Sequence, residues 1–369
     1  MNIVVQIYMI VCVVLLIFDI FFLFVKNYRN QRYYPKVPKF EEKIREQIEQ
    51  KERTGEFSEG FLAELSKKAK KTKYLLALNN VLDGCDRQRE WFRQVVFDLI
   101  GEYQKKSDYE QAYYAYVVSV FNYESDKLPG QFAYEFQKFL DSKSLYTFTN
   151  AMNAIYRFGD LNVLMYAVGK VDERNGFYHE KLFVDGMLSA RVNSGELGEI
   201  LIQRFDTYKA FTKKCILDYL RLSGYDAADF CMELIKKRKV DDELHYAAIR
   251  FFIKYPDEKS KEYFMSILSS TDSIPWVDEM MAIQGLGSYF DEKVMNAIRI
   301  RITSSNWYIR SNAAAYLRKH NISKEEIGNL IRLNDKYANE ALIYEYKNDD
   351  EMLKYISKLI EEVREEADA

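Results

Sequence analysis

The sequence predicts an all-α protein in which an N-terminal transmembrane helix is followed by an α-solenoid of helical hairpins. Three observations lead to this fold class. The 369 residues are 48% apolar and 15% aromatic, with only 5 prolines and 15 glycines, which is typical of a large helical chain. An apolar run opens the sequence. Two segments that begin at Trp276 and Trp307 repeat one pattern 31 residues apart.

The apolar run predicts a membrane anchor over residues 1–25. From Ile3 to Val25 the strongly polar side chains are Gln6 and Asp19. At about 1.5 Å per residue this run reaches ~34 Å as a helix, and a bilayer's hydrocarbon core is roughly 30 Å thick. A cleaved signal peptide fits less well, because no basic residue precedes the run and no small-x-small site follows it.

The flanking charges predict the orientation of the anchor. Residues 26–39 form a basic juxtamembrane linker without acidic residues, and its cations are Lys26, Arg29, Arg32, Lys36 and Lys39. Positive residues favour the cytoplasmic side, so we expect residues 40–369 in the cytoplasm of a single-pass protein of the cell membrane. The same cations are expected to contact anionic membrane lipid.

Asp19 is the one acidic residue within the run. A carboxylate near the middle of a bilayer costs about 2.5–3.5 kcal/mol on insertion scales. Two interpretations remain open: Asp19 pairs with a Lys or Arg of another membrane helix, or it reaches toward the cytoplasmic interface near Lys26.

Residues 40–83 are predicted to form a helical N-terminal cap. Its first helix has Ile44 and Ile48 one turn apart and ends at Thr54-Gly55. Ser58 is expected to cap a second, longer helix that extends to Leu82. Five lysines lie in the middle of that helix, and a solvated face explains them more simply than a contact with headgroups or an acidic partner. They are Lys67, Lys68, Lys70, Lys71 and Lys73.

Residues 84–369 are predicted to form the repeat solenoid, because regular short helices joined by short turns cannot bury their apolar faces alone. The predicted helices cover 86–101, 108–122, 130–141, 144–158, 160–172, 177–193, 196–206, 207–222, 226–239, 242–255, 257–270, 275–289, 291–304, 306–319, 323–333, 335–347 and 350–366.

One position of the repeat carries a small side chain, which lets a helix approach its neighbours closely. In the two copies that begin with a tryptophan, Ala282 and Ala313 hold this position, and Leu286 and Leu317 follow four residues later. Earlier copies have Ala151, Cys215 and Ala247 there, and the spacing predicts further copies near Val184 and at Ala115.

Four aspartates follow the turns that close these helices: Asp160, Asp226, Asp257 and Asp291. We expect them to cap the next helix, at about 1 kcal/mol each. Catalytic acids would have to face one another, whereas residues at repeat spacing line one edge.

The pattern from about 145 to 320 resembles HEAT repeats. Their second helix often begins with an aromatic residue, continues with Val/Ile-Arg, two small residues and a Leu, and follows an Asp or Asn. Residues 306–317 match this pattern with Asn306, Trp307, Ile309-Arg310, Ala313-Ala314 and Leu317. The segment from Trp276 departs from it, with Asp278 and Glu279 where the family has Val/Ile and Arg. The resemblance implies a bacterial protein-binding solenoid.

Catalytic motifs are incomplete. His179-Glu180 begins like a zinc-protease helix, but Phe183 stands where the second histidine must be. The Gly285-Leu286-Gly287 segment lacks a third glycine, and neither a Walker motif nor a GxSxG elbow occurs. The remaining histidines, His245 and His320, and the cysteines Cys85, Cys215 and Cys231 fall in different repeats. We therefore expect no catalytic residues, no cofactor and no metal.

The four cysteines, Cys12 included, show no paired spacing, so we expect free thiols in a reducing compartment. Tyrosine is in excess, at 29 residues, with clusters at Tyr113-Tyr114-Tyr116 and at Tyr337, Tyr344, Tyr346 and Tyr355. These are either interface side chains or side chains that fill the space between helices.

A net charge of -3 and a pI near 5.9 argue against nucleic acid as a partner. The leading hypothesis is a membrane-tethered scaffold that binds a protein, and the resemblance suggests an accessory subunit of an envelope or polysaccharide-synthesising machine. The alternatives are an enzyme on a HEAT-like fold, of the DNA-repair or lyase type, and a ligand-sensing regulator.

Overall fold

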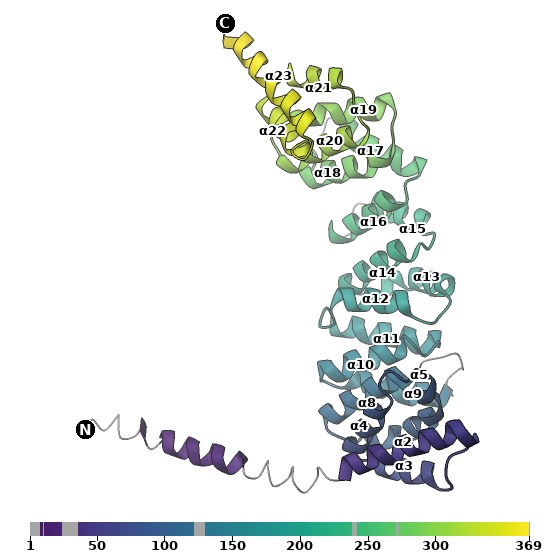
Figure 1. Ribbon diagram of the computed structural model, residues 1–369. Helices are drawn as coiled ribbons and strands as arrows, with labels where there is room; N and C mark the ends of the chain where they lie inside the picture. Colours follow the sequence, from purple (N-terminus) through teal and green to yellow (C-terminus); the bar gives the residue numbers. More distant parts are fainter. Residues whose placement is uncertain are drawn as a thin grey trace. The chain divides into compact units, whose positions relative to one another are not determined.

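A computed structural model describes residues 8–9, 11–23, 36–121, 130–237, 242–270 and 273–368. Within these residues all regular structure is helical and no strand occurs, which confirms the all-α prediction (Figure 1). The chain divides into two compact units, Met1–Asn193 and Ser194–Ala369. This division differs from the predicted one after residue 83, because helices on the two sides of that point pack together.

The predicted anchor and linker lie partly outside the described residues, and Lys26, Arg29 and Arg32 are among those left out. Residues 11–23 are helical, and their side chains, Asp19 included, are mostly exposed. Among the helices that the structure describes, none combines the length and the apolar composition needed to cross a membrane.

Unit 1 is built from short helices in two layers. In chain order they are α2 (Lys36–Thr54), α3 (Phe61–Ala69), α4 (Thr72–Val81), α5 (Asp86–Arg89), η1 (Glu90–Phe92), α6 (Arg93–Phe97), α7 (Ile100–Tyr103), α8 (Asp108–Phe121), α9 (Gly130–Phe136), η2 (Gln137–Asp141), α10 (Leu145–Ile155), α11 (Leu161–Arg174) and α12 (Glu180–Ser189). One layer contains α4, α8 and α10 in succession. The other contains α3 with α6, and then α7, α9, η2 and α11.

The structure corrects the sequence interpretation at the start of unit 1. Helix α2 begins at Lys36, so the last four residues of the predicted linker are helical. Pro38 is compatible with this start, because the first N–H groups of a helix have no partner within it and a proline there removes no bond. As predicted, the helix ends before Gly55, which has a φ of +84°.

The long helix predicted after Ser58 is two helices, α3 and α4, separated by a turn at Lys70-Lys71. Ser58 does not cap α3, whose N-cap is Gly60. Instead the Ser58 N–H donates to Oε1 of Gln47 at 2.9 Å, and its hydroxyl donates to Oε1 of Gln50 at 2.8 Å. The serine therefore joins the loop to α2.

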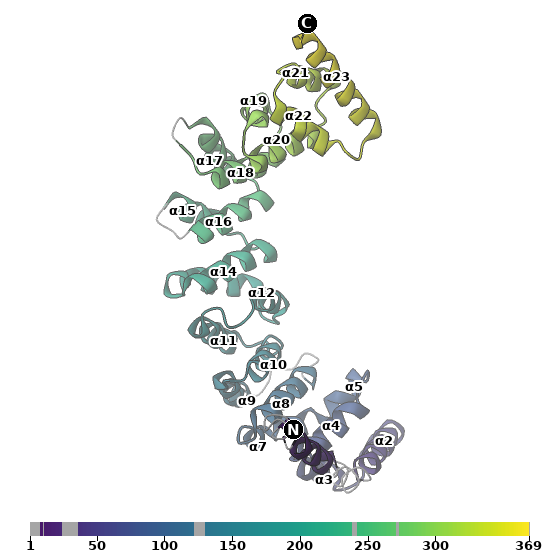
Figure 2. The same cartoon turned by 90° about the vertical axis from the view of Figure 1, so that its left-hand side faces the viewer.

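Unit 2 is a more regular succession of helical hairpins than unit 1. Its helices are α13 (Ser194–Gln203), η3 (Phe205–Thr207), α14 (Ala210–Ser223), α15 (Ala228–Lys236), α16 (Asp242–Lys254), α17 (Glu258–Ser269), α18 (Trp276–Gly285), η4 (Leu286–Ser288), α19 (Glu292–Arg299), η5 (Ile300–Thr303), α20 (Trp307–Lys319), α21 (Lys324–Ile331), α22 (Lys336–Glu345) and α23 (Asp350–Asp368). Helices α14, α16, α18, α20 and α22 form one layer, and the odd-numbered helices pack against them (Figure 2).

Three of the four predicted aspartate caps are present. The carboxylates of Asp160, Asp257 and Asp291 accept backbone N–H groups in the first turns of α11, α17 and α19. Asp226 is the exception. Helix α15 begins one residue later than such a cap requires, with Ala227 as its N-cap, and the Asp226 carboxylate accepts only the Ala228 N–H, at 3.4 Å.

The recurring small residues are buried. Ala151, Cys215, Ala247, Ala282 and Ala313 are at most 1% exposed, and the predicted copies Ala115 and Val184 are buried as well. Glycines provide the same close approach beside aromatic rings. A Cβ atom added at Gly285 would lie 2.2 Å from the Phe264 ring, and one at Gly186 would lie 2.0 Å from the Tyr156 ring.

Side chains of one hairpin donate hydrogen bonds to backbone carbonyls of an adjacent hairpin, which we call inter-hairpin carbonyl bonds. The Tyr103 hydroxyl donates to the Ala69 carbonyl, the last of α3, at 2.8 Å. Arg157 donates to the Ser119 carbonyl at 2.7 Å. Further donors are Tyr114, Asn150, Arg174, Lys254, Tyr289, Arg301, Tyr316, Lys319 and Tyr355. Some of the acceptors, such as Ala69 and Ser119, belong to the last turn of a helix, where carbonyls have no partner within it. Others, such as Asp257, also accept a backbone N–H.

Gly285→Ala is expected to destabilise the fold by about 1–3 kcal/mol, because the added Cβ overlaps the Phe264 ring. The matched control is Gly287→Ala, two residues on, where the nearest atom is the flexible Lys319 Nζ at 3.9 Å. Thermal or urea unfolding of both variants measures the difference. Equal midpoints for the two variants would contradict the close packing of α18 on α17.

Tyr289→Phe removes one inter-hairpin carbonyl bond, in which the hydroxyl lies 2.6 Å from the Asp257 carbonyl, without changing the ring. We expect a loss of about 0.5–1.5 kcal/mol in the free energy of unfolding. Tyr146→Phe, on an exposed ring of α10, is the control and should leave stability unchanged. A Tyr289→Phe variant as stable as the wild type would show that this bond does not stabilise the stack.

Glu110 makes part of the stability dependent on pH. Its carboxylate accepts hydrogen bonds from Thr72 at 2.6 Å, from Ser107 at 2.9 Å and from Lys106 at 3.2 Å. The Thr72 hydroxyl is the largest cause that lowers the pKa of Glu110 from 4.5 to about 2. A lowered pKa in the folded state gives stability that is present above pH 4.5 and is lost as the pH falls toward 2.

The wild type should therefore be more stable than Glu110→Gln at neutral pH, with a difference that shrinks between pH 4.5 and 2. Glu42→Gln, at an exposed position of α2, is the control. Urea unfolding across this pH range provides the measurement. A difference that does not change with pH would mean that the carboxylate charge contributes nothing.

Candidate interaction surface

The histidines and cysteines have separate structural environments. Nδ1 of His179 accepts the Lys181 N–H at the start of α12, and His320 stacks on Phe290 at 4.9 Å. Burial raises the pKa of the Cys231 thiol to about 12, so this sulfur is a neutral thiol near pH 7. Cys215 is buried too, whereas Cys12 and Cys85 are partly exposed, and none of the four forms a disulfide bond. In the part of the chain that the structure describes, no three His, Cys, Asp or Glu side chains are placed to hold a metal ion.

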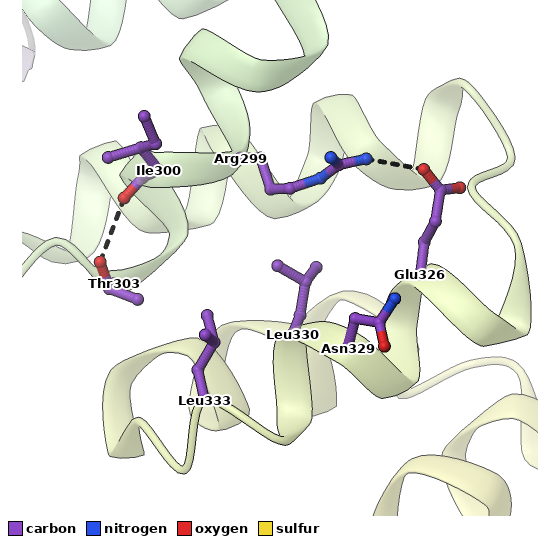
Figure 3. Close-up of a pocket in the computed structure, with 7 residues that line it drawn as sticks. All are labelled: Arg299, Ile300, Thr303, Glu326, Asn329, Leu330 and Leu333. Atoms are coloured by element: carbon purple, nitrogen blue, oxygen red, sulfur yellow. Dashed lines mark hydrogen bonds and ion pairs between the residues drawn. The ribbon is translucent and has the colours of Figure 1, made fainter.

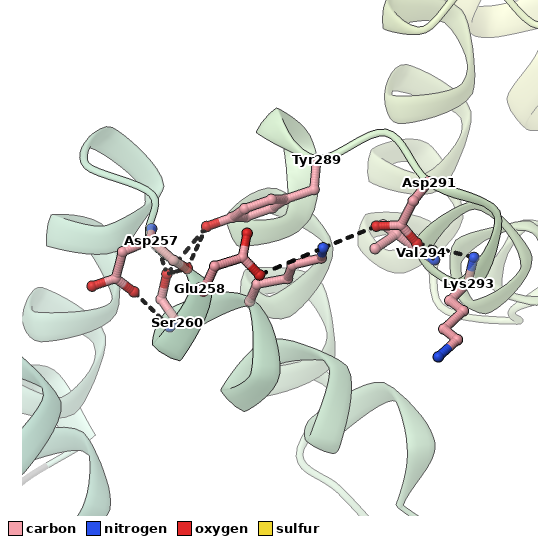
Figure 4. A network of polar contacts seen from close by, with 8 residues as sticks. Asp257, Glu258, Ser260, Tyr289, Asp291, Lys293 and Val294 are labelled. Carbon is pink, nitrogen blue, oxygen red and sulfur yellow. Dashed lines mark hydrogen bonds and ion pairs between the residues drawn. The ribbon is translucent and has the colours of Figure 1, made fainter.

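A polar network joins α17, the loop after η4 and α19 (Figure 4). Lys261 forms ion pairs with Asp291 at 3.1 Å and with Glu258 at 3.7 Å, and the Tyr289 hydroxyl reaches the Asp257 carbonyl. The Asp291 carboxylate raises the pKa of Lys261, and burial raises the pKa of Tyr289. Each carboxylate here caps a helix or pairs with a lysine, so the network connects neighbouring hairpins.

An open groove of about 480 Å³ lies between α19–η5 and α21 (Figure 3). Ile300 and Leu333 are exposed along it, and the Arg299–Glu326 ion pair, at 2.6 Å, closes one end. A small-molecule site usually combines an apolar pocket with several convergent polar groups. The other polar side chains that line this groove, Thr303 and Asn329, bond to Ile300 and Arg332 beside them.

Four exposed aromatic side chains and the half-buried Trp307 gather on the layer of unit 2 that contains α18, α20 and α22. We call this group the aromatic surface, and it consists of Trp276, Trp307, Tyr308, Tyr337 and Tyr344. Trp276 and Tyr308 stack with ring centroids 5.2 Å apart, although they are 44% and 56% exposed. Trp307 meets Tyr344 edge to face at 5.0 Å. Trp276, Trp307 and Tyr308 belong to the first turns of α18 and α20, so the repeat itself places them side by side.

Arg310 holds part of this surface in place. Its guanidinium lies 5.0 Å from the Trp307 ring and 4.8 Å from the Tyr337 ring. Nη1 donates to the Ser305 carbonyl at 2.7 Å, and Nη2 pairs with Glu340 at 3.3 Å. Because the side chain is 93% buried, these contacts fix the cation between the two rings.

A second group of tyrosines lines a groove of about 410 Å³ between α8 and α10 in unit 1. Tyr109 and Tyr146 are exposed there, together with Tyr116. Their neighbour Tyr114 is buried and makes an inter-hairpin carbonyl bond. Of the predicted cluster, Tyr114 therefore fills the space between helices, whereas Tyr116 is exposed.

The structure separates the repeat-motif residues by role. Ala151, Cys215, Ala247, Ala282, Leu286, Ala313 and Leu317 are buried. Trp276, Trp307 and Arg310 meet at or beside the aromatic surface. Sequence comparison missed Tyr308 as the stacking partner of Trp276, because it aligned the two tryptophans as equivalent residues. The adjacent aromatic pair Trp307-Tyr308 was the signal for a second ring at that position.

Neither the protein-family models nor the curated proteins contain a match to this chain.

Proposed function

We propose that this protein is a membrane-tethered cytoplasmic scaffold that binds a protein partner through the aromatic surface, on hairpins of the HEAT type. The observation that carries the proposal is the stacked, exposed Trp276–Tyr308 pair beside the Trp307, Arg310 and Tyr337 cluster. Trp, Tyr and Arg are the residues most enriched where binding energy concentrates in protein interfaces.

The geometry of the surface supports binding. An interface gains most from large side chains that are already ordered, because ordering them on binding costs about 0.5–1.5 kcal/mol per flexible side chain. Stacking holds Trp276 against Tyr308, and the buried guanidinium holds Trp307 and Tyr337. The rings therefore present an apolar area that is already ordered, with hydroxyl and indole N–H groups at its edges.

The tether is proposed from the sequence. Residues 3–25 have the length and composition of a membrane span, and the cations that follow favour a cytoplasmic location for the rest of the chain. The side chains of residues 11–23 are mostly exposed, which leaves their apolar atoms available to lipid. Confinement to a membrane raises the local concentration of the scaffold near membrane-associated partners. An accessory role in an envelope or polysaccharide-synthesising machine fits this arrangement.

A photo-crosslinking amino acid at position 308 of the full-length chain tests the proposal in cells. We expect one protein to be captured reproducibly, with a loss of roughly 30-fold in binding when Trp276→Ala removes the stacked ring, since central aromatic residues contribute about 2 kcal/mol or more.

The matched control places the crosslinker at Leu333, an exposed apolar residue at the end of α21 in the other layer. The same partner captured equally from both positions, or capture that Trp276→Ala leaves unchanged, would show that the aromatic surface is not the binding site.

A further inference from the structure

Lysines concentrate at one end of unit 1, where α2 begins. We call this the basic end, and its exposed members are Lys36, Lys39, Lys67, Lys70, Lys71 and Lys105. The turn between α3 and α4 falls at Lys70-Lys71, so these lysines do not line the middle of a helix as the sequence indicated. Within the described part of the chain, none of these six side chains forms an ion pair.

Contacts place the three segments side by side. The Phe40 ring of α2 meets the Tyr74 ring of α4 edge to face at 5.0 Å, and Lys68 Nζ lies 4.5 Å from the centre of the Phe40 ring. The first two turns of α2 therefore lie against residues 64–74, and Figure 1 shows α2 beside α3. The hydrogen bond from Thr72 to Glu110, at 2.6 Å, places the start of α8, and with it the preceding loop that carries Lys105, next to the start of α4.

Glu64, one of the acidic groups among these segments, is neutralised from within. Glu64 pairs with Lys43 at 2.6 Å and with Lys68 at 2.8 Å, and the hydrogen bond from Lys43 is the largest cause that lowers the pKa of Glu64 to about 2. Residues 36–43, 64–74 and 102–106 together contain ten lysines and four glutamates. A chain with an overall charge of -3 thus carries a strongly positive surface at this end.

We propose that the basic end docks on anionic membrane lipids, in addition to the tether. The inference rests on the proposed anchor, because the chain enters α2 directly from the linker and the basic end therefore adjoins the membrane surface. Charge complementarity identifies the lipid class, since the cytoplasmic leaflet is rich in anionic headgroups. Each lysine near such a surface strengthens binding by about fivefold.

Docking at this end orients unit 1. An anchor joined by a linker permits many orientations, whereas contact through α2 and the α3–α4 turn selects one. The surfaces of unit 1 away from the basic end then face the cytoplasm and stay available to partners.

Lysine acylation of the full-length chain, read by mass spectrometry, tests the proposal. The protein is reconstituted in vesicles of phosphatidylcholine alone or of phosphatidylcholine with phosphatidylserine. We expect acylation of Lys70 and Lys71 to slow by about fivefold or more with phosphatidylserine and to recover at high salt. Lys181, exposed at the start of α12, is the control and should react equally in both vesicles. In the double variant Lys70→Gln/Lys71→Gln, phosphatidylserine should protect Lys67 from acylation less than it does in the wild type.

Equal acylation in both vesicles would overturn the proposal, as would equal protection by soluble glycerophosphoserine or stronger protection by a single-stranded DNA. Alkaline carbonate extraction of the same samples reports on the anchor separately. If carbonate extracts the chain but phosphatidylserine still protects the lysines, the anchor is rejected and lipid docking by the basic end is supported. If the chain resists extraction but its lysines are not protected, the anchor is supported and lipid docking by the basic end is rejected.

Discussion

Backbone carbonyls at the ends of its many short helices need hydrogen-bond donors, and this need shapes the packing of the protein. Every helix leaves its last four carbonyls without a partner, and in a chain of helices this short such groups are a large share of the backbone. The chain satisfies many of them with side chains from the adjacent hairpin, such as Tyr103, Arg157 and Tyr316. Tyrosine suits this role because its ring fills the space between helices while its hydroxyl reaches a carbonyl. The bonds also fix the register of neighbouring hairpins, since most of them join residues about one repeat apart.

Close approach between hairpins is the second requirement, and it determines which side chains reach the surface. Positions such as Ala282, Gly285 and Ala313 are buried so that helices of both layers can meet, which leaves the bulky residues of the same segments at the first turns. Trp276 and Tyr308 are exposed at these first turns, and Trp307 is half-buried beside them. The repeat thus places the aromatic surface next to the close-packed small residues.

Ion pairs between helices determine which charged side chains remain unpaired at the surface. The pairs Lys43–Glu64, Lys261–Asp291 and Arg310–Glu340 cross from one helix to another, and they neutralise many of the acidic groups between hairpins. Unpaired lysines then remain at the end of unit 1 where the chain begins its first described hairpin. An aromatic surface in unit 2 and a basic surface in unit 1 give the proposed scaffold two different kinds of contact, one with protein and one with lipid.

The all-α class and the caps at Asp160, Asp257 and Asp291 could be predicted from the sequence, because helix periodicity and capping act within a few residues of the chain. Three features could not be predicted in this way: Ser58 joins α2 instead of capping α3, a turn at Lys70-Lys71 gathers the lysines at one end, and Trp276 stacks on Tyr308. These outcomes depend on contacts between residues about 11 to 35 positions apart. Such contacts form only when neighbouring hairpins are in register. The register depends on how small and aromatic side chains of one helix pack against another helix, and the spacing of residues along the sequence does not specify that packing.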